Sequence, residues 1–243
     1  MSDLCAICGL PKLPECNAEG RIVRVIGADG EVRVCPNQVK AARVAKERAG
    51  KEIANNRWPM PRRYCGAHME AARATIPDGF ESWGAETLSL IENHKRGELA
   101  VLMGVYGTGK TYAACALANE VRMAHGFAIF QNASMLADRL AYGNDPHGEA
   151  MEDILRCDLL IVDDVGRGRG SPFERETLWK VISHRHAECL ATIVTTNLGP
   201  AAFMADDLGA AILSRTRRQD TFLFEKRYAN GEASKERDAS VRP

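Results

Sequence analysis

The sequence predicts an α/β fold, a parallel sheet covered by helices on both faces, with a small cysteine-rich module before it. From residue 99 onward, short apolar segments of strand length alternate with longer segments of helical character, as in parallel βαβ units. A glycine-rich loop at 104–111 joins the first apolar segment to the first helical one. Five of the eight cysteines lie before residue 76, where no such alternation occurs. We therefore expect two domains, 1–75 and 76–243.

The first domain is expected to start with cysteines, form a hairpin and then continue as a helix. Apolar and polar residues alternate over 21–26 and over 31–35, on either side of the turn Ala28-Asp29-Gly30, which predicts two antiparallel strands. The next segment, 39–54, is rich in alanine, lysine and arginine and predicts a helix. Its polar composition offers few apolar residues for a core of its own.

The helix of the first domain is expected to stop before Pro59 and Pro61, and a second short helix is predicted over 63–74. The boundary between the domains is placed at 76–79, where Ile-Pro-Asp-Gly breaks regular structure. Basic residues outnumber acidic ones over 33–73. This segment is either a solvated helix face or a contact for a nucleic-acid backbone.

The second domain is predicted to alternate strands and helices. Continuous apolar runs of strand length indicate strands that are buried on both faces. The expected strands are 99–103, 128–131, 159–162 and 191–195. The expected helices are 110–125, 134–141 and 174–188. The tail from Tyr228 onward is polar and is expected to be at most partly ordered.

The bulk composition indicates a globular chain. The chain has 243 residues, of which 45% are hydrophobic, enough for one α/β domain and a small appendage. Its apolar runs are far shorter than the roughly 20 residues that span a bilayer, so we expect no membrane segment. The first residues lack the pattern of a secretory signal, which favours the cytoplasm. The formal net charge is zero, so no global electrostatic argument favours nucleic acid.

The glycine-rich loop predicts a phosphate-binding P-loop. Its glycines let the backbone turn so that N–H groups point at phosphate oxygens, and the helix that follows adds the positive end of its dipole. Lys110 is expected to reach the β- and γ-phosphates of ATP, and the Thr111 hydroxyl to bind Mg²⁺. The predicted nucleotide-binding residues are Gly104, Val105, Tyr106, Gly107, Thr108, Gly109, Lys110, Thr111 and Tyr112.

Two further polar groups follow predicted strands. Asp163 and Asp164 end the apolar run 159–162, the arrangement of a Walker B element, in which the first acid holds Mg²⁺ and the second orients or deprotonates water. Alone, such carboxylates could simply cap a turn. Asn197, after the next strand, is expected either to contact the γ-phosphate and the water as a sensor or to be an ordinary turn residue.

These motifs resemble the AAA+ ATPases of the DnaC helicase-loader and IstB transposition-helper group. The resemblance covers about 76–237. It rests on Ile-Pro at 76–77, the P-loop with its alanine-rich helix, Leu-Leu-Ile-Val-Asp-Asp-Val-Gly at 159–166, the helix end at Arg185, and Ile-Val-Thr-Thr-Asn-Leu at 193–198. It implies an AAA+ fold and ATP hydrolysis. Asp164 stands where this group often has glutamate, one methylene longer, so either turnover is expected to be slow or the attacking water is expected to lie closer to the carboxylate.

The resemblance also assigns roles to two arginines. Arg215, in the Ser-Arg pair that follows 211–213, would be an arginine finger that reaches the ATP of a neighbouring subunit, which implies a homo-oligomer. Arg217 and Arg218 compete for this role, and all three could be plain surface charge. Arg237 lies near the position of a second sensor, but its spacing from Ser234 is one residue longer than in the group.

The cysteines near the N-terminus predict a zinc site. Cys5 and Cys8 have the spacing with which two thiolates hold one tetrahedral Zn²⁺, and Cys65 and His68 repeat that spacing. By the resemblance to zinc-bearing loaders, Cys35 could replace one of the second pair. Cys16 is a weaker candidate. The alternative is a set of reduced thiols without metal.

The resemblance favours an ATP-dependent loader that delivers a replicative helicase to single-stranded DNA. An IstB-like helper ATPase that directs a transposase is the first alternative. A small-molecule kinase with a P-loop and an adaptor that senses ATP without hydrolysing it are alternatives from other classes.

Overall fold

The computed structural model describes residues 24–26, 32–34, 36–93, 97–141, 144–145, 147–166 and 170–225. The chain divides into two compact units, Met1–Ile53 and Ala54–Pro243. In the first unit, strands β1 (Arg24–Ile26) and β2 (Val32–Val34) pair antiparallel, which confirms the predicted hairpin. Helix α1 (Pro36–Arg57) follows and crosses the division.

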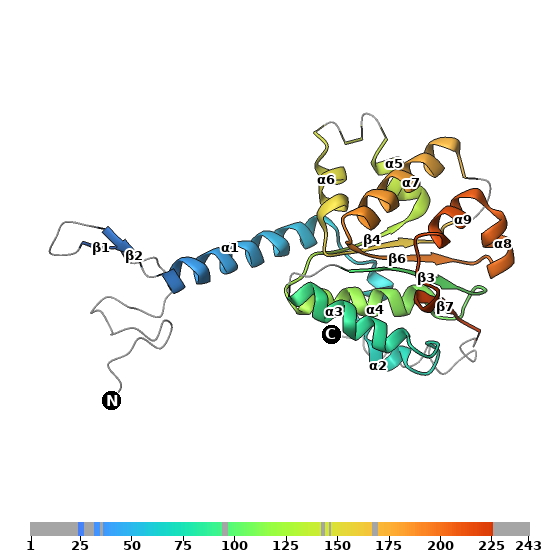
Figure 1. Cartoon of the computed structure of the whole chain (residues 1–243), viewed down its shortest axis with the longest axis horizontal. Coiled ribbons are helices and arrows are strands. Elements are labelled where there is room, and N and C mark those ends of the chain that lie inside the picture. Colours follow the sequence, from blue (N-terminus) through green and yellow to red (C-terminus); the bar gives the residue numbers. More distant parts are fainter. Residues whose placement is uncertain are drawn as a thin grey trace. The chain divides into compact units, whose positions relative to one another are not determined.

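The second unit is built on a parallel sheet in the order β4-β5-β6-β3-β7 (Figure 1). Its central strands are buried along their whole length, because helices cover both faces. The four predicted strands are confirmed, and β7 is a fifth that pairs with β3 through Val101 and Thr221. The strands are β3 (Leu99–Met103), β4 (Ala128–Asn132), β5 (Leu159–Asp163), β6 (Ala191–Thr196) and β7 (Thr221–Leu223).

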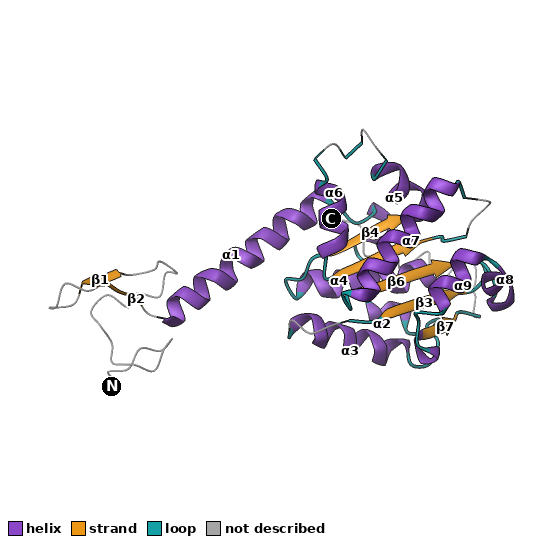
Figure 2. Ribbon diagram, turned by 45° about the horizontal axis from the view of Figure 1, so that its top comes forward, coloured by secondary structure: helices purple, strands orange, loops and turns teal. Residues whose placement is uncertain are grey.

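Alternate residues of each strand supply the two sides of the core. Ala100 and Leu102 of β3 face one apolar cluster, whereas Val101 and Met103 face the other. Helices α2 (Met69–Ala72), α3 (Phe80–Glu92) and α4 (Lys110–Met123) cover the first face (Figure 2). The second face is covered by α5 (Ala133–Arg139), α6 (Glu149–Arg156), α7 (Pro172–Ala187), α8 (Pro200–Ala205) and α9 (Asp207–Leu213).

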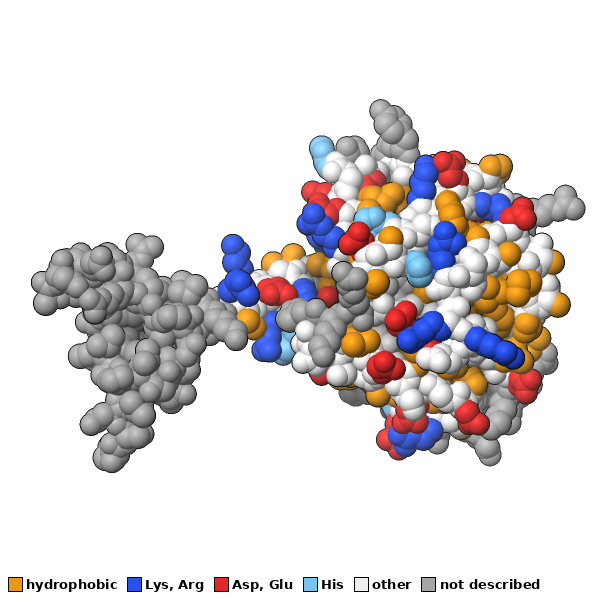
Figure 3. Space-filling view, in the orientation of Figure 1, with side chains coloured by type: hydrophobic (Ala, Val, Ile, Leu, Met, Phe, Trp, Pro, Cys, Tyr) orange, Lys and Arg blue, Asp and Glu red, His pale blue; other side chains and the backbone are white. Residues whose placement is uncertain are grey.

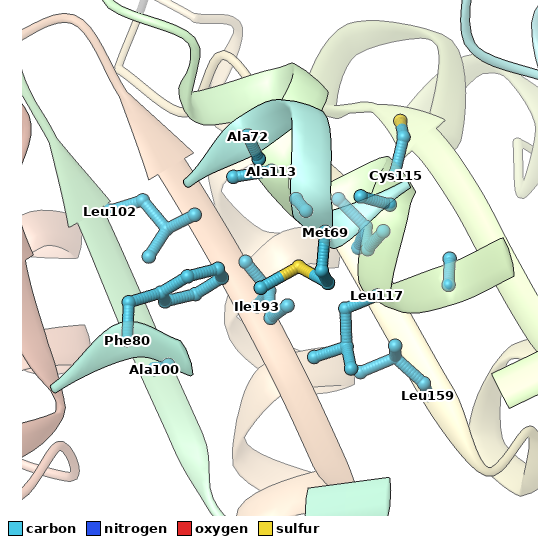
Figure 4. Close-up of a cluster of buried hydrophobic side chains, with 14 of the residues drawn as sticks. Met69, Ala72, Phe80, Ala100, Leu102, Ala113, Cys115, Leu117, Leu159 and Ile193 are labelled. Carbon is cyan, nitrogen blue, oxygen red and sulfur yellow. The ribbon is translucent and has the colours of Figure 1, made fainter. Parts of the chain in front are cut away.

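Residues 54–75 contribute to the core of the second unit. Figure 4 shows Met69 beside Phe80 and Leu117, between α4 and the sheet. Trp58 is 2% exposed and packs in the cluster on the other face. The division of the chain therefore falls at Ile53 and Ala54, earlier than the boundary expected at 75–76.

The single helix predicted over 63–74 is wrong. The segment instead forms a short 3₁₀ helix η1 (Arg62–Tyr64), a turn and α2. The side-chain amide of Asn119 on α4 holds the turn, because its Nδ2 donates to the backbone oxygens of Tyr64 at 2.9 Å and Ala67 at 2.8 Å. Those oxygens would otherwise accept hydrogen bonds within a continuous helix.

A buried guanidinium ties α7 to the sheet. Arg185 is fully buried, and its nitrogens donate to the Thr192 hydroxyl at 3.0 Å and to the backbone oxygens of Ile154, Cys157 and Ala191. Burial lowers the pKa of Arg185. A buried donor with this many acceptors joins the end of α6, the end of α7 and β6 into one rigid element.

Among the described residues, no helix is long and apolar enough to cross a bilayer. Basic and acidic side chains are interspersed over the face in Figure 3.

Candidate nucleotide-binding site

The phosphate loop leaves the carboxyl end of β3 in a conformation that requires glycine. Gly104, Gly107 and Gly109 have φ angles of 146°, 80° and 92°, a region that residues with a Cβ rarely adopt. A Cβ on Gly104 would also lie 2.3 Å from the backbone oxygen of Phe224. The sequence pattern therefore marks positions at which only glycine fits.

Helix α4 begins directly behind this loop. Gly109 precedes it with left-handed backbone and no side-chain cap, so the first N–H groups of α4 keep their capacity to bind an anion. The Thr108 hydroxyl donates to the Val105 backbone oxygen at 2.9 Å and closes the loop on itself. The loop and the helix end together form a cradle for phosphate.

Lys110 points into the loop. It is 5% exposed, and its Nζ donates to the backbone oxygens of Gly104 at 2.7 Å and Val105 at 2.9 Å, and to Oδ1 of Asn197 at 2.9 Å. Burial lowers its pKa, while the nearby Asp164 and Asp163 act in the opposite direction. The ammonium is thus held where the loop, β5 and β6 converge.

Asp163 ends β5 and accepts two hydroxyl hydrogen bonds on one oxygen. Thr111 Oγ1 donates to its Oδ1 at 2.8 Å, and Thr195 Oγ1 donates to the same atom at 2.6 Å. Burial raises the pKa of Asp163, and the two hydroxyl bonds oppose that change. A carboxylate beside a hydroxyl is a set of hard oxygen donors, which fits Mg²⁺.

Asp164 adopts an uncommon backbone conformation, with φ at 61°. Its N–H donates to Thr195 Oγ1 at 3.0 Å, and its carboxylate oxygen Oδ1 accepts a short hydrogen bond from Nδ2 of Asn197. Positive φ in a non-glycine residue persists only where the surroundings hold it, and such residues cluster at functional sites. Asn197 therefore links Lys110 to Asp164 through the two ends of its amide.

The structure brings together five of the residues that the sequence singles out: Lys110, Thr111, Asp163, Asp164 and Asn197. Other predicted residues of the loop lie differently. Val105 and Tyr106 are 47% and 62% exposed at its outer side. Tyr112 is 7% exposed and packs in the apolar cluster on the α4 face. Leu223 on β7 and Met204 on α8 are also exposed large apolar side chains. Hydrophobic atoms gather on the side of Figure 3 where α8 and α9 lie.

Arg215, at the end of α9, rests on an aromatic ring. Its guanidinium carbon lies 4.0 Å from the ring centroid of Trp179 on α7, and its Nη1 donates to the backbone oxygen of Ala211 at 2.9 Å. Arg217 is engaged elsewhere, because its Nε donates to Asp220 at 2.7 Å. Arg218 is exposed. Of the three arginines, Arg215 is the one that an aromatic platform holds in a fixed place.

Two of the predicted zinc ligands, Cys65 and His68, lie among the described residues, and each makes a hydrogen bond to its own segment of the chain. The Cys65 thiol donates to the Arg62 backbone oxygen at 3.1 Å, and His68 Nδ1 accepts from the Ala71 N–H at the start of α2. Within the described ranges, no three His, Cys, Asp or Glu side chains form a group that could hold a metal ion. The other candidate ligands Cys5, Cys8, Cys16 and Cys35, and the possible sensor Arg237, lie outside the described residues.

The sequence motifs give no role to two residues of this region, Thr195 and Trp179, although Thr195 lies within the segment 193–198. Thr195 looks like an ordinary β-branched strand residue, yet its hydroxyl contacts both acids. Trp179 looks like a helix residue of the core face, yet it carries the Arg215 guanidinium. Only the pairing of β5 with β6 and of α7 with α9 reveals them.

The profile of the family described as IstB-like ATP binding protein matches residues 82–230, more than half of the chain. The chain belongs to the IstB-like ATP-binding family. This IstB-like chain is 32% identical over 100 residues to an insertion-sequence IS1162 ATP-binding protein of Pseudomonas fluorescens, across 40% of this chain and 43% of that protein. It is 29% identical over 106 residues to an insertion-sequence ATP-binding protein of Mycobacterium tuberculosis, across 43% of this chain and 42% of that one. The matched region thus spans less than half the length of either curated relative.

Solved structures show the same fold. The DnaC helicase loader superposes on the IstB-like chain with a TM-score of 0.53 at 22% identity, covering 67% of this chain and 98% of that one. DnaI gives 0.52 at 20% identity, covering 69% and 95%. The predicted parallel sheet covered by helices and the resemblance to the IstB family are confirmed, and the fold is the one that the DnaC loader shares.

Proposed function

We propose that this IstB-like protein hydrolyses ATP with Mg²⁺ and that it does so as an assembly on DNA. The observation that carries the proposal is the chain of contacts from Lys110 through Asn197 to Asp164. These contacts bring the Lys110 ammonium, the Asn197 amide and the Asp164 carboxylate together beside the Thr111–Asp163 pair, and that arrangement supports a site for phosphate and an attacking water. The family description supports ATP binding.

Each residue has a distinct proposed task. Lys110 and the loop N–H groups bind the phosphates, and Asp164, held by Asn197, orients the attacking water. Thr111 and Asp163 would hold Mg²⁺, which supplies charge neutralisation to the phosphate oxygens. Arg215 of a neighbouring subunit would stabilise the charge that develops in the transition state.

We propose a transposition-helper role first and a helicase-loader role second. The two curated relatives are named as insertion-sequence proteins and share about 30% of their residues with this chain where they match. The loaders share its fold at lower identity. A helper should assemble along double-stranded DNA in an ATP-dependent way, whereas a loader should form a stable complex with a replicative helicase and act on single-stranded DNA.

The first experiment measures the ATPase rate per chain across protein concentration, without DNA and with single- or double-stranded DNA. An assembling ATPase should show a rate per chain that rises with concentration, because each site needs a neighbour, and that rises again when DNA gathers the chains. A rate that is flat with both variables would contradict the assembly and leave a monomeric kinase. Nucleotide binding without turnover would leave an ATP-sensing adaptor.

We also propose that the cysteine-rich segment binds zinc through Cys5 and Cys8, with two ligands from Cys35, Cys65 and His68. The support is the ligand spacing. Elemental analysis of the purified full chain should find about one zinc per chain, and a Cys5→Ser, Cys8→Ser double variant should lose it. Cys189→Ser, which changes a cysteine outside the proposed set, is the control. A full chain that folds without zinc would refute this proposal and leave the ATPase proposal intact.

A further inference from the structure

Thr195 sits between the two acids of the site. It is fully buried on β6, and the register that pairs Val162 with Val194 brings its side chain beside Asp163. Its Oγ1 donates to Asp163 Oδ1 at 2.6 Å and accepts the N–H of Asp164 at 3.0 Å. One hydroxyl thus contacts the side chain of the first acid and the backbone of the second.

The chemistry of this position needs a hydroxyl. The group has one proton to donate and lone pairs to accept, so it can serve a carboxylate and an N–H together. Valine would keep the shape of the side chain and lose both hydrogen bonds. Serine would keep both bonds and lose one methyl group.

Both bonds constrain groups that would otherwise turn. Asp163 Oδ1 accepts hydrogen bonds from two hydroxyls, that of Thr111 on α4 and that of Thr195 on β6. Within the described part of the chain, no hydrogen bond is recorded to the other oxygen, Oδ2. The N–H bond fixes the left-handed backbone of Asp164, which aims its carboxylate at Asn197.

We propose that Thr195 is a positioning residue of the ATPase site, which orients Asp163 toward the metal and Asp164 toward the water. The inference rests on the proposed function, since it concerns the use of these two acids. Partners that orient metal ligands are usually worth about 10- to 100-fold in metal affinity or activity.

The loss of any buried, hydrogen-bonded hydroxyl could destabilise the fold, whether or not that hydroxyl positions a catalytic group. Strand β6 offers a matched control for this structural effect, Thr192. Thr192 is 1% exposed, and its hydroxyl accepts from Arg185 Nε at 3.0 Å and donates to the Leu190 backbone oxygen at 3.0 Å. It lies at the opposite end of β6 from the site. Thr192→Val therefore removes a buried hydroxyl with two bonds and leaves the two acids untouched.

The test compares wild type with Thr195→Val, Thr195→Ser and Thr192→Val. Binding of a fluorescent, non-hydrolysable ATP analogue is titrated with and without Mg²⁺, and turnover and thermal unfolding are measured alongside. Thr195→Val should bind nucleotide normally without Mg²⁺, need about 10-fold more Mg²⁺ for tight binding and lose about 10- to 100-fold in kcat. Thr195→Ser should stay within about threefold of wild type, since it keeps both hydrogen bonds. Thr192→Val should lower only the unfolding temperature.

Several outcomes would overturn the inference. Wild-type Mg²⁺ dependence and kcat in Thr195→Val would show that the hydroxyl positions nothing, and the proposed function would stand. Equal losses in Thr195→Ser and Thr195→Val would assign the effect to the methyl group. If Thr195→Val does not fold, Thr195→Ala makes the same comparison with serine. If wild type binds nucleotide without turnover, the proposed hydrolysis fails, and the Mg²⁺ dependence of binding still tests Thr195.

Discussion

Replacing Lys110 with alanine should reduce ATP turnover by at least about 10²- to 10³-fold, the cost of removing one donor from a charge-stabilising site. Lys110 is the cation that the loop directs inward, and its Nζ is held by Gly104, Val105 and Asn197. Nucleotide affinity should fall as well, because the positive charge of the Lys110 ammonium is lost. Some affinity should remain, because the loop N–H groups are unchanged. Turnover and equilibrium binding of the ATP analogue measure the two effects separately.

The control for this prediction is Lys180→Ala. Lys180 is an exposed lysine of α7 whose ion pair with Glu176 spans one helical turn, a surface contact of small energetic value. The Lys180→Ala substitution makes the same change in charge and side-chain volume as Lys110→Ala, but away from the loop. If Lys110→Ala keeps the turnover of Lys180→Ala and of wild type, the site has been assigned to the wrong residues.

Replacing Arg215 with alanine should reduce turnover by about 10³-fold and leave ATP affinity near that of wild type, because an arginine supplied in trans acts mainly on the transition state. The structure favours Arg215 over its neighbours, since Arg217 is bound to Asp220 while Arg215 is presented on Trp179. Among the described residues, removal of the guanidinium breaks no ion pair of Arg215. Turnover at saturating ATP and protein, with unfolding temperature as a check, measures the effect.

Mixing variants tests whether Arg215 acts between subunits. Lys110→Ala and Arg215→Ala should each be inactive, yet a mixture should recover activity, since a chain with intact Lys110 can meet a neighbour with intact Arg215. With equal amounts in a head-to-tail assembly, about one quarter of the sites are complete. No recovery, with both variants folded and assembling, would place the arginine in cis. Arg218→Ala is the matched control, and a collapse in that variant would move the role to Arg218.

Much of the fold could be predicted because its strands are continuous apolar runs. Residues 99–103 and 159–162 are apolar throughout, and glycine or aspartate ends each run, so their limits are visible in the chain. In contrast, β7 is three residues long and follows several polar residues. It becomes a strand only because β3 pairs with it, and that pairing joins residues far apart in sequence. Helix α3 is not among the predicted helices, since it begins directly after the break in regular structure at 76–79.

Some residues of the candidate site can be predicted from sequence motifs, whereas others depend on contacts between segments that are far apart in the sequence. Lys110, Thr111 and Asp163 belong to motifs whose spacing alone carries their chemistry, so the sequence indicates them. The role of Thr195 depends on strand register, which places it against β5. The candidate zinc ligands Cys65 and His68 show the reverse: each makes a local hydrogen bond in or beside the turn held by Asn119, and their spacing in the sequence could not predict these bonds.

The stacking of Arg215 on Trp179 has a spectroscopic consequence. The chain has three tryptophans, and two of them, Trp58 and Trp83, are 2% and 5% exposed within the core. Trp179 is half-buried and has a cation over its ring. Indole emission is sensitive to a charge at that distance. Trp58 also has a guanidinium over its ring, that of Arg139 at 3.7 Å, but Trp58 is buried, so the part of a fluorescence change on assembly that Trp179→Phe abolishes is assigned to Trp179. Trp179 therefore serves as an intrinsic fluorescent reporter of contact between subunits at Arg215, so no added dye is needed, and Trp179→Phe is the control that lacks the reporter.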